Sequence, residues 1–427
     1  MKIINNPSKE TWSQILERPT KTVDDIEKTV NQIFEDVQKN GDTAVNKYTS
    51  RFDGITLENN LVSSEEINEA IHLVSEELKE AIQLAKTNIT NFHKAQKTDK
   101  VFVETANGVA CWQEKRPIQK VGLYIPGGTA PLFSTVLMLA IPAQIAGCKE
   151  IVLCSPPNKE GKIHPAILYT AHLCGVTKII KVGGIQAIAG FTFGTETIPQ
   201  VYKIFGPGNQ YVTVAKQLST KHGVAIDMPA GPSELLVLAD DSANASYVAS
   251  DLLSQAEHGA DSQVLLVSTS IELINEVEKE IEKQLAVLPR VKIAEKAIAN
   301  SKSIFVENDE IALKLINEYG PEHFIVCTNN NDFYVDNIAN AGSVFIGNYT
   351  PESAGDYASG TNHTLPTNGF SKSYSGVNLD SFTKSITFQK ISKEGIKNIG
   401  KAIELMAEAE GLDAHKNAVT IRLNDLK

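Results

Sequence analysis

Apolar residues in the first hundred positions recur at spacings of three and four, the period of amphipathic helices. The first helical stripe contains Val23, Ile26, Val30, Ile33 and Val37. Gly41 follows it as an expected stop. A second helix is predicted to begin with the capping box Ser63-Ser64-Glu65-Glu66 and to continue along one face as far as Ile82. Asn107-Gly108 separates two short apolar segments and predicts a two-residue β-hairpin.

From residue 121 onward, short apolar strands alternate with helical segments. The first series of strands is expected at Val121–Ile125, Ile151–Cys154, Ile179–Val182, Val201–Phe205 and Val224–Asp227. The second series is expected at Leu235–Leu238, Val264–Ser268, Ile304–Val306, Phe324–Cys327 and Val344–Ile346. Alternating strands and helices indicate parallel sheets covered by helices on both faces, with a ligand cleft between the two units.

The predicted fold is therefore α/β, with two doubly wound, Rossmann-like parallel-sheet domains, an N-terminal helical arm and a C-terminal dimerisation tail. We expect an N-terminal arm over 1–22 and two Rossmann-like domains over 121–234 and 235–370. Residues 23–120, between the arm and the first domain, are expected to form helices and a hairpin that pack with the second α/β domain. Residues 371–427, with a helix near Ile396–Glu410, are expected to form the tail.

The composition is that of an ordinary soluble protein and excludes two classes of function. A net charge of −11 provides no basic stripe for the phosphates of nucleic acid. The chain contains no apolar run long enough to span a membrane and no signal-peptide core near Met1. The five cysteines are odd in number and lack CxxC spacing, so they are interpreted as reduced thiols of a cytoplasmic protein.

Two glycine-rich loops follow predicted strands and precede predicted helices. They are Pro126-Gly127-Gly128-Thr129-Ala130-Pro131 and Phe205-Gly206-Pro207-Gly208-Asn209. Glycine allows backbone N–H groups to approach a pyrophosphate, and a helix start favours its negative charge. Neither loop is GxGxxG, and no acidic residue lies at the usual distance for a ribose. A simple tight turn and an unconventional dinucleotide site both remain open on this pattern.

Four short segments contain candidate catalytic or metal-binding side chains. Gln255 and His258 are expected on one face at the end of a helix that Gly259 stops, although a histidine is also favourable there without a metal. Glu322-His323 directly precedes a buried strand and is either an acid/base pair or a polar loop. Asp356 and His363 lie in a loop of small residues, and Glu410 and His415 lie in the tail.

Gln255, His258, Asp356 and His415 together provide two imidazoles, one carboxylate and one amide oxygen. This set without thiolate suits Zn²⁺, or Mn²⁺ or Co²⁺ in its place. A site of this kind with room for substrate would be catalytic or substrate-orienting. A zinc-dependent amide hydrolase and a metal-stabilised binding module are the competing interpretations.

Several long motifs resemble the histidinol dehydrogenase family, and the resemblance covers essentially the whole chain. They are VGLYIPGGTAPLFSTVLMLAIPA from Val121, FGPGN from Phe205, DMPAGPSE from Asp227, LLSQAEHG from Leu252, GPEH from Gly320, SAGDYASGTNH from Ser353 and EGLDAHKNA from Glu410. The resemblance implies oxidation of L-histidinol to L-histidine in two NAD-dependent steps through bound L-histidinaldehyde, the last step of histidine biosynthesis.

The resemblance also implies a role for individual residues. The zinc ligands would be Gln255, His258, Asp356 and His415, with one Zn²⁺ per subunit. Glu322 and His323 would be catalytic, and Ser233, His363 and Glu410 would contact substrate. Tyr124, Gln186 and Asn209 would bind NAD. The protein would be a homodimer in which His415 and Glu410 cross the interface.

A cysteine nucleophile, as in other aldehyde dehydrogenases, is a further rival for the second oxidation. Cys111 and Cys148 lie in or beside apolar segments and have no acidic or histidine partner in sequence. We therefore expect neither thiol to take part in the chemistry.

Overall fold

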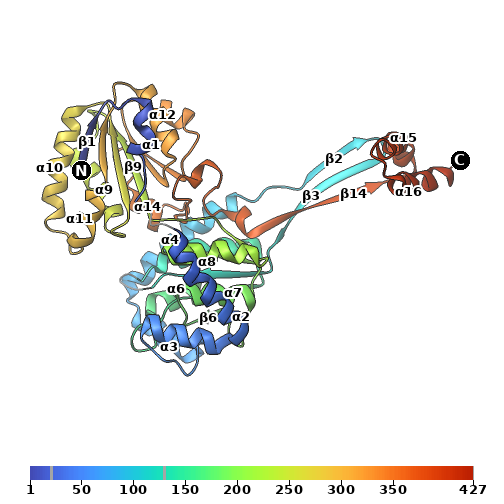
Figure 1. The fold of residues 1–427 in the computed structure, drawn as a ribbon, viewed down its shortest axis with the longest axis horizontal. Helices are drawn as coiled ribbons and strands as arrows, with labels where there is room; N and C mark the ends of the chain where they lie inside the picture. The colour runs from blue at the N-terminus through green and yellow to red at the C-terminus, as the bar shows by residue number, and fades with distance from the viewer. Residues whose placement is uncertain (20–22, 128–130, 427) are drawn as a thin grey trace.

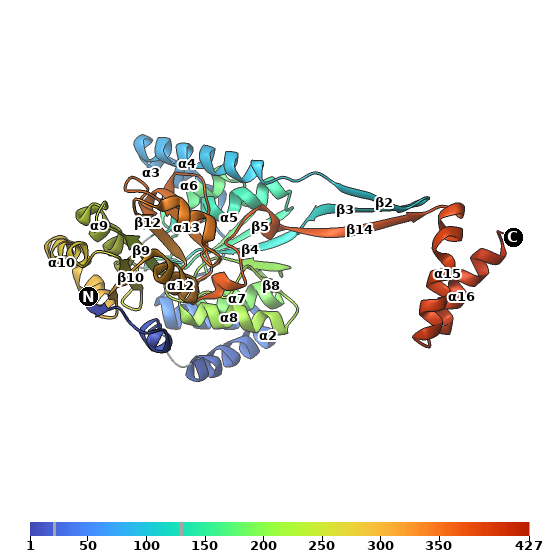
Figure 2. The ribbon, with the colours of Figure 1, turned by 90° about the horizontal axis from the view of Figure 1, so that it is seen from above.

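A computed structural model describes residues 1–19, 23–127 and 131–426, and it shows two α/β modules and a long arm (Figure 1). The first module is built on a five-stranded sheet, and the second is built on a six-stranded sheet. The arm combines a hairpin from the first quarter of the chain with the C-terminal segment, and it projects away from both modules (Figures 1 and 2).

All five strands of the first module run parallel, in the order β6-β5-β4-β7-β8. They are β4 (Lys120–Tyr124), β5 (Glu150–Cys154), β6 (Lys178–Ile180), β7 (Lys203–Phe205) and β8 (Ala225–Ile226). The chain starts in the middle of the sheet, builds one half and then crosses to build the other. The sequence prediction of a doubly wound sheet is confirmed here.

Helices cover both faces of this sheet. One face carries α3 (Ser64–Leu73), α4 (Glu76–Ala95), α5 (Phe133–Ala146) and α6 (Pro165–Leu173). The other face carries α2 (Val23–Asp53), α7 (Gly184–Phe193) and α8 (Gln210–Lys221). The prediction that the N-terminal helices pack with the second α/β domain is therefore wrong. Their apolar stripes, including Val30, Ile33, Ile82 and Ile89, are buried against the first module.

Two of the predicted N-terminal helices are interrupted. Gly41 has φ 51° and ψ −132°, so α2 bends at the predicted stop and continues to Asp53. The capping box at Ser63 and Glu66 forms as expected. The helix it opens ends at Leu73, because Val74 is extended and Ser75 caps α4. One predicted helix is therefore two.

The second module has six parallel strands in the order β1-β11-β10-β9-β12-β13. They are β1 (Lys2–Asn5), β9 (Glu234–Ala239), β10 (Gln263–Ser268), β11 (Lys302–Phe305), β12 (His323–Cys327) and β13 (Ser343–Ile346). Apart from β1, the strand order repeats that of the first module. The second doubly wound sheet is confirmed.

Helices also cover both faces of the six-stranded sheet. One face carries α9 (Ala245–Ala256), α10 (Ile271–Leu285) and α11 (Val291–Ala299). The other carries α1 (Trp12–Ile15), α12 (Asp309–Tyr319) and α13 (Asn331–Asn337). The N-terminal residues, predicted as a separate arm over 1–22, instead belong to this module as far as they are described. β1 pairs with β11, and Trp12 and Leu16 are buried in the core.

The projecting arm contains β2 (Val101–Ala106), β3 (Val109–Pro117), β14 (Thr383–Ile391), α15 (Lys393–Ala409) and α16 (Asp413–Asn424). The hairpin turns at Gly108 with φ 75°, as predicted. β14, which the sequence analysis did not predict, pairs antiparallel with β3 from Thr383 opposite Pro117 to Ile391 opposite Val109. Both tail helices lie at the far end of the arm (Figure 2). Their apolar side chains Leu405, Met406 and Ile421 are exposed.

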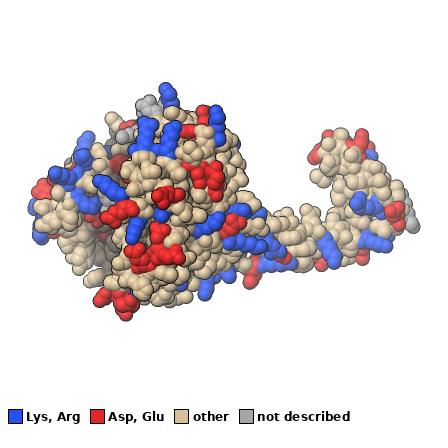
Figure 3. Space-filling view, turned by 90° about the horizontal axis from the view of Figure 1, so that it is seen from below, with Lys and Arg blue, Asp and Glu red and all other residues tan. Residues whose placement is uncertain are grey.

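The surface shows no strong segregation of charge on the face drawn in Figure 3, where acidic and basic side chains are intermixed over the modules and the arm. Among the described helices, none is both long and apolar enough to cross a membrane.

Candidate functional site

The candidate site lies where the carboxyl edge of the first sheet faces the amino edge of the second sheet. The carboxyl edge of the first sheet contributes Gly206, Pro207 and Gly208 to a cavity between the modules. The second module lines the same cavity with Ser233, Glu322 and His363 among others. Glu234 and His323 are the first residues of β9 and β12, so the second sheet presents its amino edge to this cavity.

Glu322 and His323 are buried, with only 7% and 4% of their surfaces exposed. Glu322 Oε2 accepts a hydrogen bond of 2.8 Å from the main-chain N–H of Glu234. The Nδ1 atom of His323 lies 3.6 Å from Glu322 Oε2 and 3.2 Å from Glu234 O. Its Nε2 atom has no hydrogen-bond partner and lies 3.7 Å from Asp356 Oδ1. The adjacent pair in the sequence is thus also a pair in space, with one ring nitrogen still free.

The local backbone explains why this pair is held in place. Gly320 ends α12 in the left-handed conformation, and Pro321 leads directly into β12. A Cβ atom on Gly342 would lie 2.4 Å from Glu322 O, so only glycine allows the neighbouring strand to approach this closely. Burial opposes protonation of His323, but Glu352 and Glu322 outweigh it and raise the pKa of the imidazole.

Gln255 lies in the last turn of α9 and is fully buried. Its Nε2 atom donates to Glu234 O at 3.1 Å and lies 3.1 Å from His323 Nδ1. These contacts fix the orientation of the amide and leave Oε1 buried without a partner. A buried polar atom is normally paired, so this oxygen fits a ligand such as a metal ion. His258 is exposed and lies just beyond the helix, which ends at Ala256 rather than at the predicted Gly259.

A short helix, α14 (Glu352–Tyr357), and the loop after it bring Asp356 and His363 to the same site. The prediction of a loop from Ser353 to His363 is therefore wrong as far as Tyr357. His363 Nδ1 lies 2.9 Å from Asp356 O and 3.9 Å from its carboxylate, and His363 Nε2 lies 3.2 Å from Thr135 Oγ1. Burial lowers the pKa of His363. Burial also opposes ionisation of Asp356, but His323, His363 and His258 more than compensate and lower the pKa of this carboxyl. The Asp356 carboxylate is therefore ionised at neutral pH.

Glu352 is a candidate that the sequence analysis missed. Only 1% of it is exposed, and neither carboxylate oxygen has a hydrogen-bond partner. Burial raises its pKa to about 8. One ligand atom each from His323, Glu352 and Asp356 lies within 4.8 Å of the others, which could hold a metal ion. The available signal was its position immediately before the predicted loop that begins at Ser353.

These observations together fit a divalent cation. Several carboxylates are buried close together, and an oxygen of Gln255 and a nitrogen of His323 are unpaired. A cation would satisfy the unpaired oxygen of Gln255 and balance the negative charge of the carboxylates. The structure places Gln255, His323 and Asp356 at this site, with His258 close enough to lower the pKa of Asp356.

Glu410 and His415 do not reach this site within one chain. Glu410 follows α15 and His415 lies in α16, at the far end of the arm, and both are exposed (Figure 2). If they serve the site, they must serve that of another subunit.

The three candidate cofactor residues lie at the carboxyl edge of the first sheet. Tyr124 ends β4, and its hydroxyl accepts from Gly184 N at 3.1 Å. Gln186 is 1% exposed, and both of its amide atoms lack a partner. Asn209 caps α8 by accepting from Val212 N. The structure brings these residues to one edge, as the strand positions predict.

The backbone is tightly packed at the Gly206 loop of this edge. Gly206 has φ 126°, and a Cβ atom there would lie 2.1 Å from Tyr124 O. α5 and α7 begin without a capping side chain from the N-cap residue, but Phe133 N donates to Pro131 O and Gly184 N donates to the Tyr124 hydroxyl. Gly128, Thr129 and Ala130 of the other glycine loop lie outside the described residues.

The two cysteines considered as nucleophiles lack the required environment. Burial raises the pKa of Cys148 to about 12, so its thiolate is scarce at neutral pH. Cys111 lies on β3 of the arm. All five cysteines lie in the described part of the chain and are free thiols.

Comparison with known proteins identifies close relatives. The family model described as histidinol dehydrogenase matches residues 16–423. The chain is 61% identical over 427 residues to histidinol dehydrogenase of Bacteroides thetaiotaomicron, with 100% of both chains covered. It is 52% identical to that of Escherichia coli K12, covering 99% of this chain and 97% of the relative.

Solved structures agree with these matches. The crystal structure of histidinol dehydrogenase from Elizabethkingia anophelis superposes with a TM-score of 0.97 at 56% identity, covering 100% of this chain and 98% of the other. An acetylating aldehyde dehydrogenase from Geobacillus thermoglucosidasius has a TM-score of 0.50 at 15% identity, covering 88% of this chain and 93% of the other. The second similarity concerns the fold alone.

Proposed function

Since the chain belongs to the histidinol dehydrogenase family, we propose that it oxidises L-histidinol to L-histidine in two successive NAD⁺-dependent steps through bound L-histidinaldehyde. One observation carries the proposal. Glu322 lines the same cavity as the glycine loop of the first module, and it is buried beside His323, which contacts the amide of Gln255. The proposal is supported because an acid/base pair and an amide with an unpaired oxygen are neighbours beside that loop.

We assign the zinc site to Gln255, His258 and Asp356 of one chain and to the partner subunit's His415. When bound, zinc would orient the substrate through its imidazole and amine, as a template rather than as a redox centre. Ser233 and His363 line the cavity and would contact the substrate, together with His323 and the partner subunit's Glu410. The donor set contains nitrogen and oxygen only, which suits zinc with Mn²⁺ or Co²⁺ as substitutes.

Tyr124, Gln186 and Asn209 would bind NAD⁺ at the carboxyl edge of the first sheet. When bound, NAD⁺ would accept one hydride ion in each oxidation. The unpaired amide of Gln186 supports this assignment, because a buried amide without a partner fits a polar group of a ligand.

His323 is the proposed base for the alcohol. Its Nε2 atom is free, while Nδ1 is held against Glu234 O, so the ring is oriented and one nitrogen remains available. With a cation at Asp356, less negative charge faces the imidazole, which can then take the hydroxyl proton as the carbon loses its hydride. The products of this step are the aldehyde, one NADH and one proton.

Glu322 is the proposed base for the water that hydrates the aldehyde. Its carboxylate lies beside His323 and lines the same cavity. Removal of a proton from water allows its oxygen to bond to the aldehyde carbon, and oxidation of the hydrate then gives the acid, a second NADH and a further proton. No cysteine is needed for this step.

The arm supports a homodimer. It exposes apolar side chains on its hairpin and helices, including Phe102, Leu405 and Met406, while Glu410 and His415 lie far from their own cleft. An arm that reaches across to a second copy would bury these side chains and complete the partner's site. Free thiols and a small-molecule biosynthetic substrate favour a cytoplasmic location.

Subunit hybrids would test the exchange. The inactive variants His323→Asn and His415→Asn should regain part of their activity when mixed, because one hybrid site would contain both intact residues. No recovery after confirmed subunit exchange would mean that each site is built within one chain.

The principal experiment measures NADH released per molecule of limiting L-histidinol, with Zn²⁺ and after chelation. We expect two NADH, loss of activity on chelation and recovery with metal. A single NADH would contradict the role of Glu322. The alternative, a zinc-dependent amide hydrolase, uses the same ligands and predicts turnover of an amide without NAD⁺.

A further inference from the structure

We propose that Arg18 is a positioning residue for the reaction: it holds the side chain of Glu234 so that the main chain of Glu234 orients Glu322, His323 and Gln255. Arg18 belongs to the N-terminal segment, and its hydrogen bonds go to Glu234, Tyr319 and Gly320 rather than to these three residues. The inference rests on the proposed function, since it assigns a task to the residues that support the same catalytic pair.

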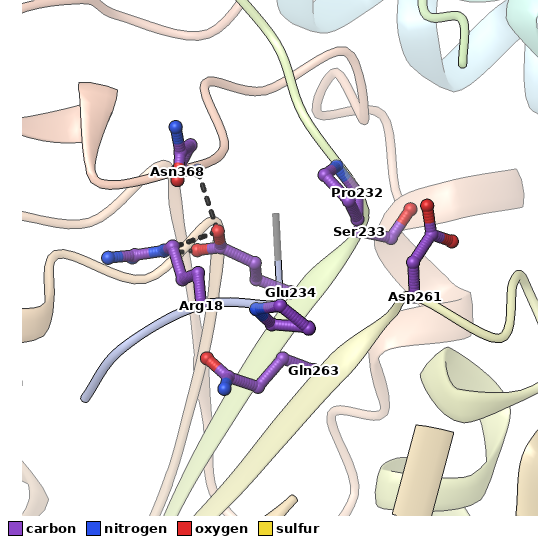
Figure 4. A pocket seen from close by; sticks show the side chains of 8 residues that line it. Arg18, Pro232, Ser233, Glu234, Asp261, Gln263 and Asn368 are labelled. Carbon is purple, nitrogen blue, oxygen red and sulfur yellow. Dashed lines mark hydrogen bonds and ion pairs between the residues drawn. The ribbon is translucent and has the colours of Figure 1, made fainter. Parts of the chain in front are cut away.

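Arg18 and Glu234 form a two-pronged ion pair (Figure 4). Arg18 Nε donates to Glu234 Oε1 at 2.6 Å, and Nη2 donates to Oε2 at 2.9 Å. The side chains are 16% and 3% exposed. Asn368 N donates to Glu234 Oε1 at 2.6 Å, which holds the carboxylate from a second side. The Glu234 side chain therefore has one well-defined position.

Arg18 is itself held by the second module. Its Nη2 donates to Tyr319 O at 2.9 Å, and the guanidinium lies 4.0 Å from the centre of the Tyr319 ring. The Tyr319 hydroxyl donates to Gln263 Oε1 at 2.9 Å, and Gln263 Nε2 donates to Glu17 O at 2.9 Å. These contacts connect Glu17 and Arg18, which precede α2 of the first module, to the starts of β9 and β10 in the second module. Lysine could not reproduce a planar fork that also stacks on an aromatic ring.

The main chain of Glu234 contacts the proposed catalytic groups directly. Its N–H donates to Glu322 Oε2 at 2.8 Å. Its carbonyl oxygen accepts from Gln255 Nε2 at 3.1 Å and lies 3.2 Å from His323 Nδ1. One peptide position thus contacts both members of the acid/base pair and the amide whose other atom is the free metal-ligand oxygen.

A purely stabilising ion pair explains these observations less well. Burial raises the pKa of Glu234 even with Arg18 beside it, which indicates that burying this charge is costly. Buried pairs are often no better for stability than apolar side chains of similar volume. Orientation is a different requirement, because a catalytic group displaced by about 1 Å can lose about a hundredfold in rate.

The test compares Arg18→Met and Arg18→Lys with Trp12→Phe. Trp12 is buried in the same N-terminal segment and donates to Pro7 O, so its replacement loosens that segment without touching Glu234. For full-length, zinc-loaded protein we expect kcat for L-histidinol to fall about a hundredfold in Arg18→Met and about tenfold in Arg18→Lys. The KM for histidinol and the zinc content should stay near wild type, and Trp12→Phe should keep wild-type kcat.

The outcomes separate this inference from the proposed function. Equal kcat losses in Arg18→Met and Trp12→Phe, or unchanged kcat in Arg18→Lys, would overturn the positioning role. If Arg18→Met fails to fold, Arg18→Lys decides, because its charge still neutralises Glu234. If the wild-type protein releases no NADH from histidinol, the proposed function fails. In that case zinc affinity, measured by competition with a chelator below saturation, still tests the inference. A weaker affinity in Arg18→Met than in Trp12→Phe would support it, and equal affinities would overturn it.

Discussion

The two modules share a strand order but use opposite edges of their sheets. In the first module, Tyr124 and the Gly206 loop lie at the carboxyl ends of β4 and β7, where open parallel sheets usually bind ligands. In the second module, Glu234 and His323 lie at the amino ends of β9 and β12. Strand order alone therefore does not locate the site in this protein.

The difference decides which helix ends face the cavity. The first module directs the starts of α7 and α8 to its carboxyl edge, and a helix start favours an anion. The second module directs the end of α9, with Gln255, to its amino edge, and a helix end favours a cation. One wall of the cleft thus suits a pyrophosphate, and the other suits a metal ion.

Side chains cap three helix starts at the carboxyl edge of the second module. At the carboxyl ends of the six-stranded sheet, Asn244, Ser270 and Asn308 cap the starts of α9, α10 and α12. In the first module, the N-cap residues of α5 and α7 provide no side-chain cap, whereas His164 caps α6 and Asn209 caps α8. The contrast supports a division of labour between the modules, and four substitutions would test it.

The largest effect is expected from His323→Asn at the amino edge of the second sheet. Loss of a general base should lower kcat about a thousandfold, while metal content and folding stay intact. Steady-state kinetics and metal analysis would measure this. The control is His172→Asn, an exposed histidine of α6 that should have no effect. Full activity in His323→Asn would remove the catalytic role from this edge.

Gly206→Ala should be the next most damaging change. The residue has φ 126°, and the added Cβ would meet Tyr124 O at 2.1 Å, so we expect a loss of about 3 kcal/mol in unfolding free energy and weaker NAD⁺ binding. The matched control is Gly223→Ala, where φ is 84° but no atom lies within 4 Å. Similar behaviour of the two variants in urea unfolding and NAD⁺ titration would show that close approach at the loop is unimportant.

Asp251→Asn tests the negative charge on the cation-favouring wall. Burial raises the pKa of Asp251 from 3.8 to about 7, so the folded chain holds this proton more tightly than the unfolded chain does. The folded protein therefore loses stability relative to the unfolded chain as the pH rises from about 4 to 7 and this buried carboxyl ionises. In metal-free protein, Asp251→Asn should be more stable than wild type by about 2 kcal/mol at pH 8 and by much less at pH 4. Chemical unfolding at both pH values would measure the difference, and a pH-independent gain would exclude this explanation.

The smallest effect is expected at the carboxyl edge of the second sheet. The Asn308 side chain accepts from Ile311 N at 3.0 Å, and Asn308→Ala should cost about 1 kcal/mol of stability through the lost cap. Its kcat and both KM values should match wild type. A large kinetic defect in this variant would mean that the carboxyl edge of the second sheet also takes part in function.

The central strands of both sheets could be predicted because parallel strands buried on both faces appear as continuous apolar runs. β1 and β14 could not, since Lys2–Asn5 and Thr383–Ile391 mix polar and apolar residues and gain their order from partners far away in the chain. The stripe of α4 showed which face is buried but not which module buries it. That choice depends on surfaces that exist only after folding.

The site shows the same limit. Glu322 and His323 are adjacent in sequence, and the motifs that resemble the family marked Gln255, Asp356 and the other candidates. Arg18 and Glu352 can be recognised only in the folded structure. Arg18 is marked by its ion pair with Glu234, more than 200 positions away, and Glu352 is marked by two unpaired carboxylate oxygens. Local patterns contain no information about such pairings.

The pairing of β3 with β14 also has a consequence for folding kinetics. It joins Val109 to Ile391, and both α/β modules except the first strands and helices lie in the loop that this pairing closes. Contacts of such long sequence separation form slowly, whereas each module is built mainly from neighbouring strand and helix pairs. Refolding should therefore show a fast phase in which the two modules form and a slower phase in which β14 pairs with β3. A chain caught between the two phases would have both cores and no finished arm.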